Sequence, residues 1–293
     1  MREQLLKWLG KQTQPLPSME IPLKDPEKEK ARAFFDSEIE IKLVSREVVS
    51  SEKLKIDRCS NEIYILELKD DGKALFKPME GATDDMRDKI KKETYHKRER
   101  AAYLVDRFLG FGLVPPTVIR EQGSWIGSAH DFIDDHRVGF ELEKSEKLDL
   151  KDDFIKMWLF DYIIWNSDRN VGNWLVKNKK LYAIDHGLSF APTDILRFYH
   201  NFFDESIPQE IKQKILDFSS WEQGREVLRT MLKEQLTSEE ADACLARIDV
   251  LANWLKDHDE IPGNIPGLLN FTSDYRNKDP RKMVVQEADS SDW

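Results

Sequence analysis

The sequence predicts an α+β fold in which the strands come first and the helices follow. Apolar residues alternate with polar ones over residues 39–49 and 62–76, and two short strand-like runs lie at 124–127 and 129–133. From residue 154 onward the apolar side chains recur at helical spacing instead. A group of strands followed by a group of helices is typical of the α+β class.

Length and composition are compatible with this class. The chain has 293 residues, which suffices for one large domain or for two lobes. Hydrophobic residues make up 40% of it, so a substantial core can form, while 34% charged residues predict a water-exposed surface. The formal net charge of −10 argues against binding to nucleic acid or to an anionic membrane. Both are negatively charged and bind proteins that have a positive field at their surface.

The sequence also predicts where in the cell the protein is located. No apolar run reaches the ~18 residues of a membrane span, so we expect no stable membrane insertion. Lys7 interrupts the apolar residues near the N-terminus, which lack the continuous core of a secretory signal. Cys59 and Cys244 lie far apart and form neither a metal motif nor a disulfide framework. We therefore expect a cytoplasmic protein, although an effector exported without such a signal would have the same features.

The elements of the first half are expected in the following order. Residues 1–12 have the pattern of a short amphipathic helix, and four prolines then predict an extended linker. A strand is expected over 39–49. Residues 62–78 predict a hairpin whose turn contains Gly72 and whose returning strand carries Lys77. A lysine at the end of a strand is in general most often an exposed side chain.

A long helix should follow the hairpin. Asp84 or Asp85 can cap its start, and Gly110 marks its end. Residues 89–100 of this helix are basic. Such a stretch is usually a solvated face, and the alternative is a site for an anionic partner or a polyphosphate regulator. Glu99 lies within the stretch and could merely support its basic neighbours on the helix surface.

The second half begins with a buried helix and ends in further helices. Five large apolar side chains share one helical spacing, namely Phe154, Met157, Trp158, Tyr162 and Trp165. A polar turn comes next, and a hairpin over 174–184 follows it. Helices are expected over 211–218 and 221–235, and a third opens with a capping box at Thr237. Beyond residue 270 the chain is polar.

The polar turn and the end of the second hairpin carry the candidate catalytic and metal-binding residues. Asp168 and Asn173 have four residues between them, and Asp185 precedes His186 and Gly187. Protein kinases place a catalytic Asp and a metal-binding Asn at this spacing, and a second metal-binding Asp before a Gly. Phosphoryl transfer needs a carboxylate that orients the acceptor and oxygen ligands for Mg²⁺. The alternative is a surface turn with capping side chains.

These motifs resemble those of the atypical kinases grouped around the phosphatidylinositol 3- and 4-kinases and the HipA-type protein kinases. Residues 166–173 match the group's Asn-x-Asp-Arg-x-x-x-Asn loop, and residues 184–187 match its Ile-Asp-His-Gly motif. Phe76-Lys77-Pro78 and residues 98–106 are also similar to this group, in the same order along the chain. The resemblance covers about residues 58–215.

The resemblance implies a bilobal protein-kinase-like fold. The expected division is an N-terminal helix and linker over residues 1–30, a β-rich N-lobe over 31–133, a mainly helical C-lobe over 134–270 and a flexible tail over 271–293. It further implies that Lys77, held by Glu99, binds the α- and β-phosphates of ATP. Asn173 and Asp185 would bind Mg²⁺, and Asp168 would orient and deprotonate the acceptor. Arg169 would steady the loop.

The resemblance also implies two further segments that contact the nucleotide, and the first of them departs from the group's pattern. The phosphate-covering loop of the group is rich in glycine, whereas here it reads Arg58-Cys59-Ser60-Asn61-Glu62. Glycine lets backbone amides approach phosphate closely, so Ser60 and Asn61 would have to donate from side chain and backbone instead. Ile133 aligns with the hinge, whose backbone binds adenine.

The function expected from this resemblance is ATP- and Mg²⁺-dependent transfer of the γ-phosphate to a hydroxyl acceptor. Between residues 188 and 207 the only basic residues are Arg197 and His200, which favours a protein Ser or Thr over an inositol head group as acceptor. The alternatives are a phosphoinositide or small-molecule kinase and a pseudokinase-like nucleotide-binding scaffold. Transfer of AMP in place of phosphate stays open as well.

Overall fold

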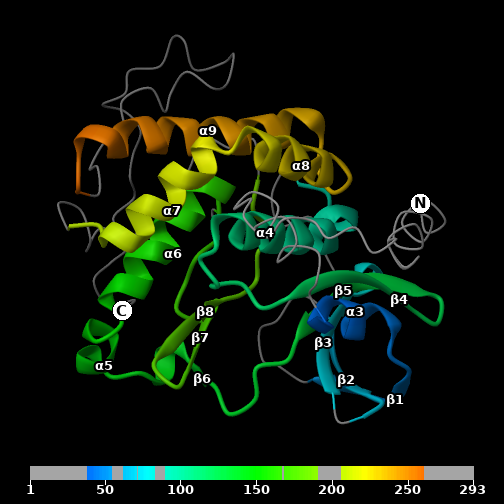
Figure 1. The fold of residues 1–293 in the computed structure, drawn as a ribbon. Coiled ribbons are helices and arrows are strands. Elements are labelled where there is room, and N and C mark those ends of the chain that lie inside the picture. Colours follow the sequence, from blue (N-terminus) through cyan, green and yellow to red (C-terminus); the bar gives the residue numbers. More distant parts are fainter. Residues whose placement is uncertain are drawn as a thin grey trace, which may run out of the picture. The chain divides into compact units, whose positions relative to one another are not determined.

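The computed structural model describes residues 38–54, 62–70, 72–82, 90–166, 168–190 and 206–260 (Figure 1). The chain divides into two compact units, Met1–Asp36 and Ser37–Trp293, and every described residue belongs to the second. The expected helix over residues 1–12, the linker after it, Ser60, Asn61 and the tail beyond residue 270 lie outside the described ranges.

A five-stranded antiparallel sheet forms the first part of the described chain, with strand order β1-β2-β3-β5-β4 (Figure 1). Its strands are β1 (Val48–Leu54), β2 (Ile63–Leu68), β3 (Gly72–Pro78), β4 (Thr117–Gln122) and β5 (Trp125–Asp131). The core on one side of the sheet is built from Leu66, Leu68, Ala74, Phe76, Val118 and Ala129. The predicted hairpin of β2 and β3 is confirmed, and Leu66 and Leu68 face the core as its alternation requires.

The strand expected over 39–49 is wrong in its first part. Residues Glu38–Ser45 form helix α3, and only residues from Val48 onward join the sheet. Alternation would have buried Ile41 beside Leu43, yet Leu43 is buried in the sheet core while Ile41 is 58% exposed. Glu40, one turn before Leu43, forms an ion pair with Arg100 at 2.5 Å. A helix turns Glu40 and Leu43 to the same side, which a strand cannot do.

Helix α4 (Tyr95–Leu109) begins later than expected from Asp84 or Asp85. The residues directly before it form the short 3-10 helix η2 (Lys92–Thr94), and η1 (Met79–Gly81) follows β3. Thr94 is the N-cap residue of α4, and its side chain makes no capping hydrogen bond to the helix. The Thr94 hydroxyl instead donates to the Lys91 carbonyl at 2.7 Å. The predicted end at Gly110 is confirmed, with φ at 67° in the left-handed region.

The two strand-like runs at 124–127 and 129–133 form one strand, β5, which pairs with β4 along its length and with β3 along part of it. The sheet therefore ends at Asp131. A boundary between lobes near residue 133 stays a prediction.

The rest of the described chain is mainly helical. Its helices are α5 (Lys144–Leu148), α6 (Lys151–Ile164), α7 (Gln209–Ser220), α8 (Glu222–Lys233) and α9 (Ser238–Asp257). A small sheet of β6 (Arg137–Val138), β7 (Trp174–Lys177) and β8 (Lys180–Ala183) accompanies them, with the 3-10 helix η3 (Gly139–Glu141) beside it. The α+β class is thus confirmed, as a β-sheet N-terminal region and a helical C-terminal part.

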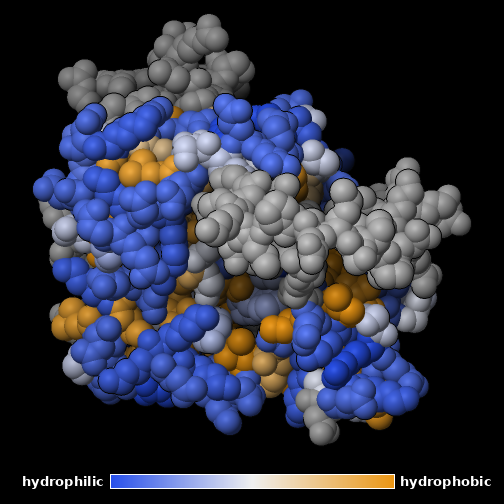
Figure 2. Space-filling view, in the orientation of Figure 1, coloured by the Kyte–Doolittle hydropathy of each residue, from blue (hydrophilic) through white to orange (hydrophobic). Residues whose placement is uncertain are grey.

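The helices pack around α6 and α4. Helix α9 contacts α6, α7 and α8, and α4 contacts both α7 and α8 (Figure 1). Helix α6 is buried almost all round, as the predicted aromatic spacing requires. Hydrophilic residues cover most of the described surface in Figure 2. None of the helices in the described ranges combines the length and the hydrophobicity needed to cross a membrane.

Candidate active site

The polar turn after α6 is held in place by the helix that precedes it. Trp165 takes a left-handed conformation with φ at 54° and ends the helix. The side-chain nitrogen of Asn166 donates to the Asp161 carboxylate at 3.0 Å, and its side-chain oxygen accepts the Asp168 N–H at 3.0 Å. Because Asn166 is buried, both hydrogen bonds are shielded from water. The position of Asp168 is therefore set by α6.

Arg169 ties this loop to two other segments. Its guanidinium makes two hydrogen bonds of 2.9 Å to the carboxylate of Asp161, and both side chains are buried. It also donates to the carbonyls of Asn173 and Ile184, the latter at 2.8 Å. A bidentate Arg–carboxylate pair fixes orientation as well as distance. Asp161 was not identified from the sequence, because its position inside an apolar helix carries no motif.

Asn173 lies where it can offer an oxygen. Its side-chain nitrogen donates to the Asp168 carbonyl at 2.7 Å, which leaves its side-chain oxygen as an acceptor. Its backbone carbonyl accepts the Ile184 N–H at 3.1 Å. That bond places Asn173 next to the segment containing Asp185. Asp185 itself has φ at 60°, a conformation that costs a non-glycine residue about 1–3 kcal/mol and that clusters at functional sites.

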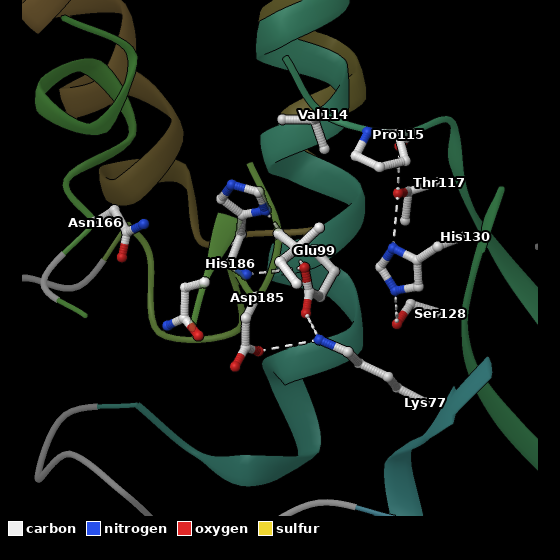
Figure 3. Close-up of polar contacts among 12 residues, drawn as sticks. Lys77, Glu99, Val114, Pro115, Thr117, Ser128, His130, Asn166, Asp185 and His186 are labelled. Atoms are coloured by element: carbon white, nitrogen blue, oxygen red, sulfur yellow. Dashed lines mark hydrogen bonds and ion pairs between the residues drawn. The ribbon is translucent and has the colours of Figure 1, made fainter. Parts of the chain in front are cut away.

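Lys77 lies between two carboxylates from distant parts of the chain (Figure 3). Its ammonium is 2.6 Å from Glu99 Oε1 on α4 and 3.0 Å from Asp185 Oδ1. Burial by itself lowers the pKa of Lys77, but Asp185 and Glu99 outweigh it and hold that pKa above its ordinary value. The lysine is therefore charged, and its third N–H direction is available to a further acceptor.

The strand pairing that carries Lys77 depends on a glycine. Gly127 of β5 is paired with Pro78 of β3. A side chain there would bring its Cβ to 2.3 Å from the Lys77 carbonyl oxygen. Only glycine lets the two strands approach this closely.

Glu99 uses its second oxygen as well. Oε2 accepts the backbone N–H of His186 at 2.9 Å, directly after Asp185 (Figure 3). Burial by itself raises the pKa of Glu99, yet the charge of Lys77 and the neighbouring side chain of His186 hold it well below its ordinary value. The ionised Glu99 thus joins the lysine of β3 to the turn that carries Asp185.

A buried chain of hydrogen bonds lies behind Lys77 (Figure 3). The Thr117 hydroxyl donates to the Pro115 carbonyl at 2.8 Å, so it must accept from His130 Nδ1, which is 3.0 Å away. Burial lowers the pKa of His130 to about 4, so the ring is neutral near pH 7. Its Nε2 then accepts from the Ser128 hydroxyl at 2.9 Å. Sequence reasoning missed His130, since its only signal is a histidine in an apolar strand.

The basic stretch at 89–100 is not a continuous solvated face. His96 and Arg98 are buried, and Arg98 contacts Glu240 at 2.6 Å. Arg100, with its side chain 16% exposed, is bound to Glu40 and to the Thr117 carbonyl. These three side chains therefore serve contacts inside the protein. An anionic partner at this helix stays a prediction that concerns the lysines alone.

Three further residues were expected to contact the nucleotide, namely Ser60, Asn61 and Ile133. Ser60 and Asn61 fall outside the described residues. Ile133 lies two residues beyond β5, and its carbonyl contacts His136 Nδ1. Adenine recognition at this position would have to use other backbone groups of the segment.

The residues fit a magnesium ion. In the described ranges no group of three His, Cys, Asp or Glu side chains lies close enough for a metal site, which argues against an all-protein cage. Mg²⁺ instead keeps several waters and takes one or two protein oxygens plus phosphates. The free side-chain oxygen of Asn173 and the half-exposed carboxylate of Asp185 are such a pair. A pocket beside them is lined by Lys77, Glu99, Ser128, Asp185 and Gly187, among others.

Comparison with known proteins finds a family match over part of the second half of the chain. Residues 151–260, which include α6, the polar turn, β7, β8 and α7 to α9, match the phosphatidylinositol 3- and 4-kinase family. No curated protein sequence matches the chain.

Comparison with solved structures finds several kinases. The Golgi casein kinase is 16% identical, with a TM-score of 0.51 over 75% of this chain and 75% of that chain. Another structure of the Golgi casein kinase, with Mn and ADP bound, has a TM-score of 0.49 at 16% identity over 79% and 76%. A proinflammatory kinase of Helicobacter pylori has a TM-score of 0.47 at 13% identity over 73% and 98%.

The first of these likenesses shows a kinase-like fold for this chain. Together with the family match over residues 151–260 it supports an atypical kinase, and it agrees with the expected resemblance to the atypical protein-kinase-like superfamily.

Proposed function

We propose that the protein is an ATP- and Mg²⁺-dependent kinase that transfers the γ-phosphate of ATP to a hydroxyl acceptor, with a protein Ser or Thr as the favoured acceptor. The observation that supports this function best is the placement of Lys77 between Glu99 and Asp185, at 2.6 and 3.0 Å. A charged, fixed lysine beside two carboxylates suits the binding of nucleotide phosphates, because catalysis of phosphoryl transfer is mainly positioning and charge neutralisation.

Each candidate residue of the site has a role in this proposal. Lys77 binds the α- and β-phosphates, and Glu99 holds it in place. Asn173 and Asp185 hold Mg²⁺, which neutralises phosphate charge when bound. Asp168 orients the acceptor hydroxyl and takes its proton, and Asn166 supports this by fixing the Asp168 backbone at 3.0 Å. Arg169 keeps the loop against α6. Ser60, Asn61 and Ile133 remain candidates for contacts to the nucleotide.

A lipid acceptor is the second candidate. The family that matches residues 151–260 is named for phosphatidylinositol kinases, which favours it. The scarcity of basic residues between 188 and 207 speaks against it, because an inositol phosphate needs cationic partners. A nucleotide-binding scaffold is a weaker candidate, since Lys77, Asp168, Asn173 and Asp185 are all present. A cytoplasmic location remains our expectation from the sequence.

The test uses purified protein with Mg²⁺ and ATP that carries the label on the γ- or the α-phosphate. The wild type should transfer γ label to itself, to a protein panel or to phosphatidylinositol vesicles, and Asp185→Ala should lose this transfer. The accepting component identifies the acceptor class. Transfer of α label would mean AMP transfer instead. No transfer with either label, despite ATP binding measured by thermal shift, would contradict the kinase proposal and favour a scaffold.

A further inference from the structure

Helix α9 contacts both parts of the candidate site. In its first turn, Glu240 forms an ion pair with Arg98 of α4 at 2.6 Å. Two turns later, Arg247 donates from Nε to the Ile163 carbonyl of α6 at 2.7 Å. Its guanidinium also lies 5.4 Å from the centre of the Trp165 ring. The spacing of seven residues places Glu240 and Arg247 on the same face of α9.

Arg98 leads from α9 to Asp185. It precedes Glu99 in α4, and its Nη1 donates to the Ser189 carbonyl at 2.6 Å. Glu99 accepts the His186 N–H at 2.9 Å. Two consecutive residues of α4 therefore hold the two ends of the turn that directly follows Asp185. Because Glu99 also holds Lys77, a shift of α4 would move the lysine and the turn together.

Arg247 acts at the other part of the site. Ile163 lies in the last turn of α6 and Trp165 is its C-cap, directly before the loop that carries Asp168. The last carbonyls of a helix have no partner within it, and a cation there is favoured by the helix dipole. Arg247 is only 8% exposed, so its contact fixes the point at which the chain leaves α6.

The contacts of Arg98 fix the relative positions of α4 and α9 more than they stabilise the fold. The side chains of Arg98 and Glu240 are 4% and 9% exposed. A buried ion pair loses much of its attraction to desolvation, and well-packed apolar residues often stabilise a fold as well or better. What the pair adds is a fixed relation between α4 and α9. Glu240 is itself fixed, because its Oε2 accepts the Thr237 N–H at 3.0 Å in the capping box.

We propose that α9 positions the active site. In this account Glu240 acts through Arg98 on α4 and on the turn after Asp185, while Arg247 acts on the start of the Asp168 loop. Arg98, Glu240 and Arg247 are positioning residues, and none of them touches substrate. The proposal rests on the proposed kinase function for its kinetic consequence, but its structural consequence can be measured without activity.

The variant Glu240→Gln tests the proposal by changing the ion pair between Arg98 and Glu240. Glutamine keeps the capping box but removes the charge that faces Arg98. Glu239→Gln is the matched control, since Glu239 is an exposed neighbour in the same turn. The double variant Arg98→Met with Glu240→Gln removes both charges, so it avoids a buried unpaired arginine and remains informative where the single variant folds poorly.

Hydrogen exchange of the full chain, followed by mass spectrometry, gives the first readout. We expect the amides of residues 185–190 to exchange about tenfold faster in Glu240→Gln and in the double variant, because the turn opens locally more often. The second readout is kcat/KM for ATP, which should fall about tenfold, since misplacement by a fraction of an ångström weakens positioning. Glu239→Gln should change neither.

The result that overturns the proposal is unchanged exchange at residues 185–190 in a double variant whose urea midpoint equals that of the wild type. Faster exchange spread evenly over the whole chain, with a lower urea midpoint, also overturns it, because it shows a merely structural role. If the wild type transfers no phosphate, the kinase proposal fails by itself, and the exchange data still decide whether α9 positions the turn.

Discussion

His130 shows what a single buried residue adds to the site. Its ring accepts from Ser128 and donates to Thr117, and Ser128 is paired with Lys77 across β3 and β5. No pattern in the sequence distinguishes His130 from any other histidine in a strand. Its state follows only from its surroundings, because burial lowers its pKa to about 4 and the neighbouring hydroxyls select the tautomer.

His130 predicts a pH dependence of stability. Below its ordinary pKa of 6.5 the unfolded chain binds a proton at this ring, whereas the folded chain does so only near pH 4. The contribution of His130 is therefore complete above pH 6.5 and declines as the pH falls toward 4. From the two pKa values, about 2 kcal/mol should be lost between pH 7.5 and pH 5.

Urea unfolding at pH 7.5 and pH 5 measures this effect. The wild type should lose about 2 kcal/mol more than His130→Gln over that interval. Every other titratable group is common to both proteins, so the difference in pH dependence reports on His130. An equal pH dependence in the wild type and in His130→Gln would contradict the assignment.

Among the elements, helix α6 and the loop after it depend on one buried pair. Asp161 and Arg169 make two hydrogen bonds of 2.9 Å, and Arg169 reaches on to Asn173 and Ile184. Asp161→Asn should therefore destabilise the fold by about 3–5 kcal/mol, because it leaves a buried guanidinium without its counter-charge. Asp152→Asn, on the exposed first turn of the same helix, should cost about 1 kcal/mol or less. Urea unfolding compares the two.

A loss below about 1 kcal/mol for Asp161→Asn would show that the loop does not depend on this pair. Equal losses in both variants would have the same meaning, since they would reflect the general cost of removing a carboxylate from α6.

Elements with local signals could be predicted, and those held by distant contacts could not. The hairpin of β7 and β8 follows from two short apolar runs around Asn178 and Lys179, whose φ angles of 51° and 60° fit a tight turn. Helix α3 has an apolar alternation that looks like a strand. In the helix, Glu40 pairs with Arg100, 60 residues away, and Leu43 packs into the sheet core, contacts that no local pattern contains.

For the whole molecule, the order of the motifs was enough to predict a kinase-like fold. Order along the chain survives where sequence identity is low, since each motif is tied to one element of the fold. The sequence could also name Lys77, Glu99, Asn173 and Asp185 as candidates. It could not indicate that α9 reaches the site, because Arg98 and Glu240 are 142 residues apart and each resembles an ordinary surface residue.

Hydrogen bonds join the candidate residues from several elements. Glu99 joins Lys77 of β3 to the turn after Asp185. Arg169 joins α6 to Ile184, directly after β8. The Asn173 side chain donates to the Asp168 carbonyl. In the proposed function the carboxylate of Asp168 orients the acceptor hydroxyl and takes its proton. Phosphoryl transfer by this chain should therefore depend on that carboxylate.

The most direct test is a single-turnover measurement of γ-phosphate transfer from Mg²⁺-ATP by the wild type and by Asp168→Asn. The rate should fall by about 10²–10⁴-fold in the variant, because a positioned general base is removed. ATP affinity, measured in parallel, should stay within a few-fold, since Asp168 does not bind the nucleotide in this account. A transfer rate in Asp168→Asn within a few-fold of the wild type would contradict the assigned active site.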